Sequence, residues 1–126
     1  MSYTQGDVRW EVEYTDEFEE WWTTLTMNDQ AAIDRAVQEL AERAPALGRP
    51  WVDTITGSRH PNVKELRPRG GYLRVLFAFD PRRTAILLIG GDKEGQWTAW
   101  YEQLIPIADQ LYDEHLATLK QEEELS

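Results

Sequence analysis

The chain of 126 residues contains no cysteine. This absence excludes disulfide bonds, zinc sites with thiolate ligands and a cysteine nucleophile. Long apolar runs are also missing, because the most apolar stretches, residues 73–79 and 85–89, are far shorter than the roughly 20 residues that a membrane-spanning helix needs. The N-terminal residues 1–7 show neither the basic region nor the apolar region of a signal peptide. These absences predict a cytoplasmic protein without a membrane segment.

What the chain does contain is typical of a globular protein. Hydrophobic residues make up 41% of it, charged residues make up 29%, and six residues are tryptophan. Its length suits a single domain, because domain sizes cluster at about 100–150 residues. We expect one domain over residues 1–126, with an ordered core at about residues 8–119 and an acidic tail at residues 120–126.

The charges are distributed unevenly along the chain. The formal net charge is −10, yet residues 59–93 hold eight basic and three acidic residues, a balance of +5. The rest of the chain holds five basic and 20 acidic residues, a balance of −15. A chain charged in this way can bind anions at one surface although its net charge is negative.

The hydrophobic pattern predicts an α+β domain in the order β-α-α-β-β-β-α. Residues 8–14 alternate between apolar and polar, which indicates a half-buried strand, and residues 16–25 and 29–44 carry apolar side chains at helical spacing. Thr15–Asp16 and Asn28–Asp29 are the predicted N-caps of this helical hairpin. Three antiparallel strands are expected at residues 63–68, 72–79 and 84–89, with a loop at residues 51–61. A last helix is expected to start near Pro106, and residues 97–103 are either a separate helical turn or continuous with it.

This order places the helical hairpin on one face of an antiparallel sheet. Two helices cover one face only, so the other face is expected to stay partly open. Because the three-stranded meander carries the basic residues 59–93, the open face and the positive charge are expected to coincide.

Familiar catalytic motifs are scarce. A Ser-His-Asp triad is weakly supported, since His60 and His115 are the chain's histidines and no serine stands in a G-x-S-x-G motif. Neither metal-ligand spacing nor a glycine-rich nucleotide motif occurs, so we expect no metal and no cofactor.

The remaining candidates are basic side chains near the predicted strands. Lys64 and Arg67 flank the first strand of the meander, Arg74 points away from the apolar face of the middle strand, and Lys93 follows the third strand. Together they can hold one phosphate and stabilise the charge of a phosphoryl transition state. A 2′-hydroxyl can then attack its own 3′-phosphate if His60, Lys64 or Lys93 moves a proton. The candidate RNA-binding residues nearby are Arg59, Arg69, Trp97, Trp100 and Tyr101.

Residues 58–67 contain the letters K-E-L-R at residues 64–67, and this segment resembles the corresponding motif of the RelE/ParE-like toxins, in particular their HigB branch. Residues 72–81, 87–93 and 105–116 continue the resemblance, which covers about residues 8–120. The motif lysine and arginine match Lys64 and Arg67, the middle-strand arginine matches Arg74, and the basic residue after the last strand matches Lys93. His60 is a looser match.

The resemblance implies a RelE-like β-α-α-β-β-β-α fold and the toxin of a type II toxin–antitoxin pair. Toxins of this kind are endoribonucleases that need no metal, cleave mRNA on the translating ribosome, and thereby inhibit translation and growth. The implied partner is a small helix-turn-helix antitoxin, similar to HigA.

Simpler interpretations stand beside these. Lys64 and Arg67 can be solvated strand residues, Arg74 can pair with Glu65 or Asp92, and the aromatic residues 97, 100 and 101 can pack in the core. Two other functions also fit the fold: a ParE-like toxin that blocks a protein target such as DNA gyrase, and an inactive interaction module.

Overall fold

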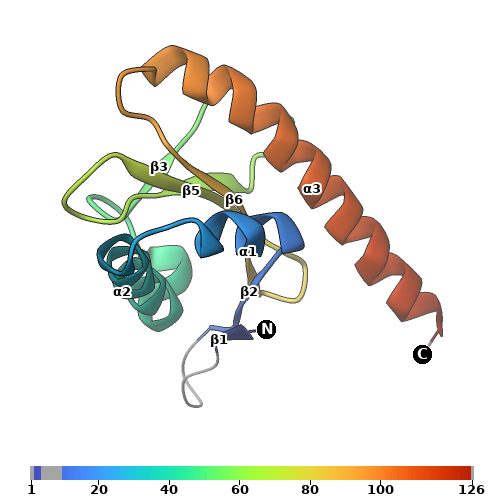
Figure 1. The fold of residues 1–126 in the computed structure, drawn as a ribbon. Helices are drawn as coiled ribbons and strands as arrows, with labels where there is room; N and C mark the ends of the chain where they lie inside the picture. The colour runs from blue at the N-terminus through green and yellow to red at the C-terminus, as the bar shows by residue number, and fades with distance from the viewer. Residues whose placement is uncertain (1, 4–9, 126) are drawn as a thin grey trace.

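The computed structural model describes residues 2–3 and 10–125. The elements in chain order are β1 (Ser2–Tyr3), β2 (Val12–Tyr14), α1 (Asp16–Thr23), α2 (Met27–Arg43), the short 3-10 helix η1 (Ala44–Ala46), β3 (Val52–Thr54), β4 (Val63–Leu66), β5 (Leu73–Phe79), β6 (Ala85–Asp92) and α3 (Trp97–Leu125). The predicted α+β class is confirmed: α1 and α2 lie against the sheet, and α3 runs past it as one long helix (Figure 1).

The described strands form one sheet in the order β1-β2-β6-β5-β4-β3. The predicted meander is confirmed, because β4, β5 and β6 pair antiparallel in sequence order. β2 pairs parallel to β6, and β3 adds an outer strand within the segment predicted as a loop. β6 continues through Gly90 and Gly91 to Asp92, whereas the strand was expected to end at residue 89. Residues 8–9 of the first predicted strand lie outside the described residues.

Two apolar cores form, one on each face of the sheet. On β5, Val75 and Phe77 pack toward α1 and α2, whereas Leu76 and Ala78 pack toward α3. This alternation follows from the two-residue period of a strand. This second face is therefore less open than expected, because α3 covers part of it.

Threonine hydroxyls cap the N-terminal ends of α1 and α2. Thr15 Oγ1 accepts a hydrogen bond of 3.0 Å from the Phe18 amide, which confirms the predicted first N-cap. The second helix begins earlier than predicted, because Thr26, and not Asn28–Asp29, accepts a bond from the amide of Asp29. Such a bond satisfies one of the free amides in the first helical turn.

The last helix begins at Trp97 and contains Pro106, so it starts well before the proline that was expected to open it. Pro106 is exposed, and the helix continues through it. The acidic tail, which was expected to lie outside the ordered core, is helical as far as Leu125. None of the helices in the described part of the chain is long and apolar enough to cross a membrane.

Close packing on β6 gives a test of the fold. A Cβ atom at Gly90 would collide with the ring of Trp21 on α1, whereas a Cβ atom at Gly48 would meet no atom within 4 Å. We expect Gly90→Ala to lower the free energy of unfolding by about 1–3 kcal/mol, as overpacking does, and the control Gly48→Ala to leave it nearly unchanged. Urea denaturation measures both, and equal midpoints for the two variants would contradict this packing.

Candidate active site

A buried carboxylate lies at the centre of the candidate site. Glu65 on β4 is fully buried, and it points to the α3 side of the sheet, where it lies opposite Leu76 of β5 and Asp53 of β3. Its Oε1 accepts a hydrogen bond of 2.6 Å from Arg67 Nε, and Arg74 Nε lies 3.8 Å from the same oxygen. A buried carboxylate is costly unless positive charge surrounds it. Glu65 therefore requires the cations around it.

The two arginines reach Glu65 from different strands. Arg67 follows β4 and also contacts Asp53 at 3.3 Å. Burial lowers the pKa of Arg67, but the hydrogen bond to Glu65 and the negative charges of Glu65 and Asp53 together outweigh burial, so the pKa is raised. Arg74 lies on β5 with only 11% of its side chain exposed, and its Nη1 donates to the carbonyl of Leu73 at 2.7 Å.

Two polar atoms at this centre lack hydrogen-bond partners among the described residues. They are Glu65 Oε2 and Arg74 Nε, and both are buried. Buried polar atoms are nearly always paired in folded proteins. Arg74 Nε is thus a buried donor whose nearest carboxylate oxygen, Glu65 Oε1, lies 3.8 Å away, beyond hydrogen-bond distance.

Lys93 completes the cluster from the connection between β6 and α3. It is 3% exposed, and its Nζ donates to the Tyr101 hydroxyl at 3.1 Å. The ammonium also lies 4.3 Å from the centre of the Trp97 ring, a cation–π contact. Burial, together with repulsion from Arg74, lowers the pKa of Lys93, although Glu65 acts in the opposite direction. Lys93 is therefore a stronger acid than an ordinary lysine.

Tyr101 on α3 keeps its proton in this environment. Burial and the nearby Glu65 raise the pKa of Tyr101 to about 12. At neutral pH its hydroxyl is a hydrogen-bond donor as well as the acceptor for Lys93. We call Glu65, Arg67, Arg74, Lys93 and Tyr101 the Glu65 cluster.

The Glu65 cluster can bind and stabilise an anion. Its three cations face one buried carboxylate, while Asp53 lies on the outer side of Arg67 and pairs also with Arg49. Cations held in place by a protein stabilise charge that develops in a transition state, and they do so most strongly where water is excluded. Within residues 2–3 and 10–125, no three His, Asp or Glu side chains form a group that could hold a metal ion.

Lys64 and His60 do not join this cluster, contrary to the prediction. Lys64 lies opposite Phe77 on β5, on the face covered by α1 and α2. His60 Nε2 lies 2.7 Å from Asp113 Oδ1, toward the far end of α3. Tyr101 and Asp113 are twelve residues apart on that helix, a distance of about 18 Å at 1.5 Å per residue. Of the predicted catalytic residues, the structure brings Arg67, Arg74 and Lys93 together around Glu65.

The predicted RNA-binding residues also do not all lie at the Glu65 cluster. Arg59 pairs with Asp113 at 2.6 Å, beside His60, and Arg69 lies over the ring of Trp51. Trp100 is 3% exposed and packs in the core, so it cannot stack on a base. Trp97, by contrast, is 54% exposed.

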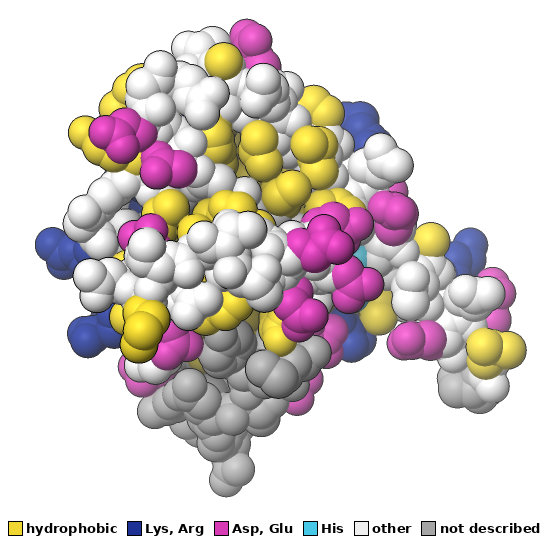
Figure 2. Space-filling model, viewed as in Figure 1, with side chains coloured by type: hydrophobic (Ala, Val, Ile, Leu, Met, Phe, Trp, Pro, Cys, Tyr) yellow, Lys and Arg dark blue, Asp and Glu magenta, His cyan; other side chains and the backbone are white. Residues whose placement is uncertain are grey.

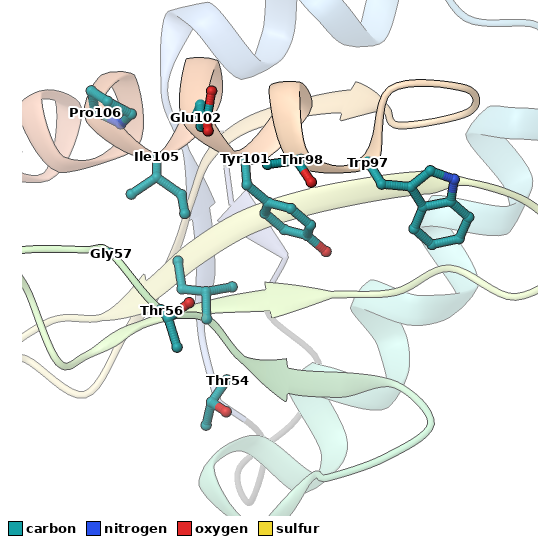
Figure 3. Close-up of a pocket in the computed structure, with 10 residues that line it drawn as sticks. Thr54, Thr56, Gly57, Trp97, Thr98, Tyr101, Glu102, Ile105 and Pro106 are labelled. Atoms are coloured by element: carbon teal, nitrogen blue, oxygen red, sulfur yellow. The ribbon is translucent and has the colours of Figure 1, made fainter.

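A cleft lies beside the Glu65 cluster, between the segment that follows β3 and the first turns of α3 (Figure 3). Its volume is about 630 Å³, within the range of small-molecule sites. Tyr101 and Trp97 belong to both the cleft and the surroundings of Lys93.

Sequence reasoning missed two parts of this site. Glu65 was considered only as a member of a motif and as a possible partner of Arg74, yet it shares a strand face with the buried Val63, and this spacing could have marked it as buried. The cleft depends on contacts between residues far apart in the chain, which no local pattern reveals.

Comparison with known proteins places the chain in a family. A family model described as "Phage derived protein Gp49-like" matches residues 20–113, a range that contains the whole Glu65 cluster. The chain belongs to the Gp49-like family. This family assignment rests on three quarters of the sequence rather than on one motif.

Two proteins of Mycobacterium tuberculosis are similar to this Gp49-like chain. One, named "Putative toxin HigB3", is 49% identical over 100 residues, which cover 79% of this chain and 88% of that protein. The other, named "Putative toxin HigB2", is 48% identical over 100 residues, which cover 77% of this chain but 50% of that protein, about half its length. These matches confirm the resemblance to the HigB branch.

Solved structures confirm the RelE-like fold. The isolated RelE toxin of Escherichia coli matches with a TM-score of 0.56 at 12% identity, covering 72% of this chain and 92% of RelE. The RelBE2 toxin–antitoxin complex of M. tuberculosis contains a chain that matches with a TM-score of 0.54 at 17% identity, covering 68% of this chain and 99% of that one.

The charge of Glu65 makes a testable prediction about its neighbours. In Glu65→Gln, the pKa of Lys93 should fall further and the pKa of Tyr101 should fall as well, because the carboxylate raises both. NMR of the lysine side chains and ultraviolet titration of the tyrosines measure these changes. Glu102→Gln, an exposed position next to Tyr101, is the control. An unchanged or higher pKa of Lys93 in Glu65→Gln would show that the two groups are not coupled.

Proposed function

We propose that this Gp49-like protein is the toxin of a type II toxin–antitoxin system and that it is an endoribonuclease which cleaves mRNA without a metal ion. The observation that carries the proposal is the convergence of Arg67, Arg74 and Lys93 on the buried Glu65. A protein that only blocks a target such as DNA gyrase has no need for such an arrangement of charges.

In this mechanism the scissile phosphate lies against the two arginines and Lys93. The 2′-hydroxyl of the preceding ribose loses its proton to solvent and attacks the phosphorus, and the bond from phosphorus to the 5′-oxygen breaks. Arg74 Nε, which lacks an acceptor among the described residues, donates to a phosphate oxygen as negative charge develops. The products are a 2′,3′-cyclic phosphate and a 5′-hydroxyl.

Lys93 is the residue to which we assign proton transfer. Its lowered pKa makes the ammonium a better acid than that of an ordinary lysine. It protonates the leaving 5′-oxygen, and the Tyr101 hydroxyl orients it through the hydrogen bond of 3.1 Å. His60 and Lys64 have no part in this mechanism, since neither joins the Glu65 cluster.

The acidic surplus of the chain is compatible with RNA binding. Acidic side chains gather over α1 in Figure 2, and α1 packs on the face of the sheet opposite the Glu65 cluster. Screening in physiological salt limits the reach of these charges to about 8 Å. The binding of a phosphate at the Glu65 cluster therefore depends mainly on the nearby cations.

We further propose a small helix-turn-helix antitoxin, similar to HigA, as the partner. The two M. tuberculosis relatives carry the name HigB, and the RelBE2 structure is a complex of a toxin with its antitoxin. An antitoxin that covers the Glu65 cluster would block the phosphate site. The cytoplasm, where mRNA is translated on the ribosome, is the proposed location.

Arg74 offers the sharpest test of this function. Arg74→Ala should lower the rate of RNA cleavage about 10²–10³-fold, the usual cost of one lost transition-state contact, and should relieve growth arrest. Arg74→Lys should restore little, because an ammonium lacks the planar fork of a guanidinium. Cleavage should persist in EDTA and should leave 2′,3′-cyclic or 3′-phosphate ends on the 5′ fragment.

The control for this test is Arg35→Ala, an arginine of α2 whose side chain is 68% exposed. Circular dichroism must show that each variant is folded, because Arg74 is largely buried. If Arg74→Ala is folded and still cleaves RNA at the wild-type rate, the proposed mechanism is wrong. If the wild type arrests growth without cleaving RNA, a protein target replaces mRNA.

A further inference from the structure

The cleft beside the Glu65 cluster is built from two segments far apart in the chain. Its lower wall is formed by Thr54, the last residue of β3, and the following residues 55–57, and its upper wall is the first part of α3, from Trp97 to Pro106. In Figure 3, the side chains of Tyr101 and Ile105 point from α3 toward this lower wall. The lining combines apolar side chains with polar groups, namely Glu102, the threonine hydroxyls of Thr54, Thr56 and Thr98, the Tyr101 hydroxyl and the Trp97 indole nitrogen.

The shape of this cleft is held by a buried anchor. Asp109, 2% exposed on α3, accepts hydrogen bonds from Ser58 Oγ at 2.5 Å and from the Arg59 amide at 2.9 Å. These bonds tie the chain that follows Gly57 to the helix that forms the opposite wall. The two walls are therefore fixed relative to each other before any ligand binds, which reduces the entropy cost of binding.

The cleft and the Glu65 cluster are neighbouring parts of one surface. The hydroxyl of Tyr101 accepts the hydrogen bond from Lys93, while the same residue lines the cleft. Trp97 likewise lies under the Lys93 ammonium and lines the cleft. A molecule with a phosphate at the cations therefore reaches into the cleft with the group attached to that phosphate.

We infer that this cleft binds the nucleobase of a nucleotide directly adjacent to the scissile phosphate, an inference that rests on the proposed function. A nucleobase has flat apolar faces, which suit the walls formed by Ile55, Ile105 and the aromatic rings. Its polar edge can bond to threonine hydroxyls, which both donate and accept. A phosphate bound to the Glu65 cluster also fixes the ribose, so the base enters the cleft without a separate binding event.

Two changes test this inference, one in the RNA and one in the protein. The RNA carries an abasic nucleotide at either position that flanks the scissile bond. The variant Thr56→Trp fills the cleft from its exposed lower wall without changing the Glu65 cluster. Thr118→Trp is the matched control, because Thr118 is exposed on α3 and is not part of the cleft.

We expect the wild type to lose about 5- to 150-fold in kcat/KM on one of the two abasic RNAs, since contacts of a base with aromatic side chains are worth about 1–3 kcal/mol. Thr56→Trp should show a similar loss on intact RNA and little further loss on the abasic RNA. Thr118→Trp should behave as the wild type does on both. If the losses caused by Thr56→Trp and by the abasic nucleotide do not add, both changes remove the same contact, and the base lies in the cleft.

The other outcomes are distinct. If the wild type cleaves intact and abasic RNAs equally well, the inference is wrong and the proposed function stands. If Thr56→Trp cleaves normally but no longer binds the antitoxin, a peptide occupies the cleft and the inference is wrong. If the wild type cleaves no RNA, the proposed function fails. The inference about the cleft is then tested by measuring the binding of the intact and abasic RNAs with fluorescence anisotropy. Equal affinity for the two RNAs, or no binding of either, would overturn the inference.

Discussion

The burial of one carboxylate, that of Glu65, determines how this site is organised. The strand period directs Glu65 to the face that α3 covers, where water cannot solvate its charge. A charge in that position must be balanced, so Arg67, Arg74 and Lys93 are drawn to it from three separate segments. The same attraction keeps the cations close together although they repel one another. The result is a preorganised group of positive charges on an acidic protein.

The long helix α3 links this site to the rest of the fold. Its first turns supply Trp97 and Tyr101, which contact Lys93, and its middle part forms the second core with β5 and β6. Toward its other end, His60 lies 2.7 Å from Asp113, and His115 lies 2.8 Å from Asp80. The chain's two histidines thus pair with carboxylates between α3 and the adjoining loops, and neither histidine belongs to the Glu65 cluster.

Local patterns predicted much of the fold and part of the site. The helical stripes and the short turns identified the hairpin of α1 and α2 and the meander of β4, β5 and β6, because these features depend on near neighbours in the chain. Alternation along the strands correctly placed Arg74 away from the apolar face of Val75 and Phe77. The same alternation places Lys64 and Arg67, three residues apart, on opposite faces of the sheet. The two residues had been grouped because they belong to one motif.

The remaining features depend on contacts between distant segments. No local signal shows that α3 begins at Trp97 and covers the face expected to be open, or that His60 pairs with Asp113. β3 is three residues long and is recognisable only through its pairing with β4. Trp100 could be assigned to the core only once Gly91, against which its ring packs, was placed on the sheet.

The most direct test of this account is to add a nucleoside 3′-phosphate to the protein and follow its arginine and lysine side chains by NMR. If the Glu65 cluster is the phosphate site, the Nε signal of Arg74 should shift as it gains an acceptor, and the pKa of Lys93 should rise beside the bound anion. Arg82, which pairs with Glu13 and Asp80, should not respond. Shifts at Arg82 or at other basic residues, with Arg74 and Lys93 unchanged, would contradict the account.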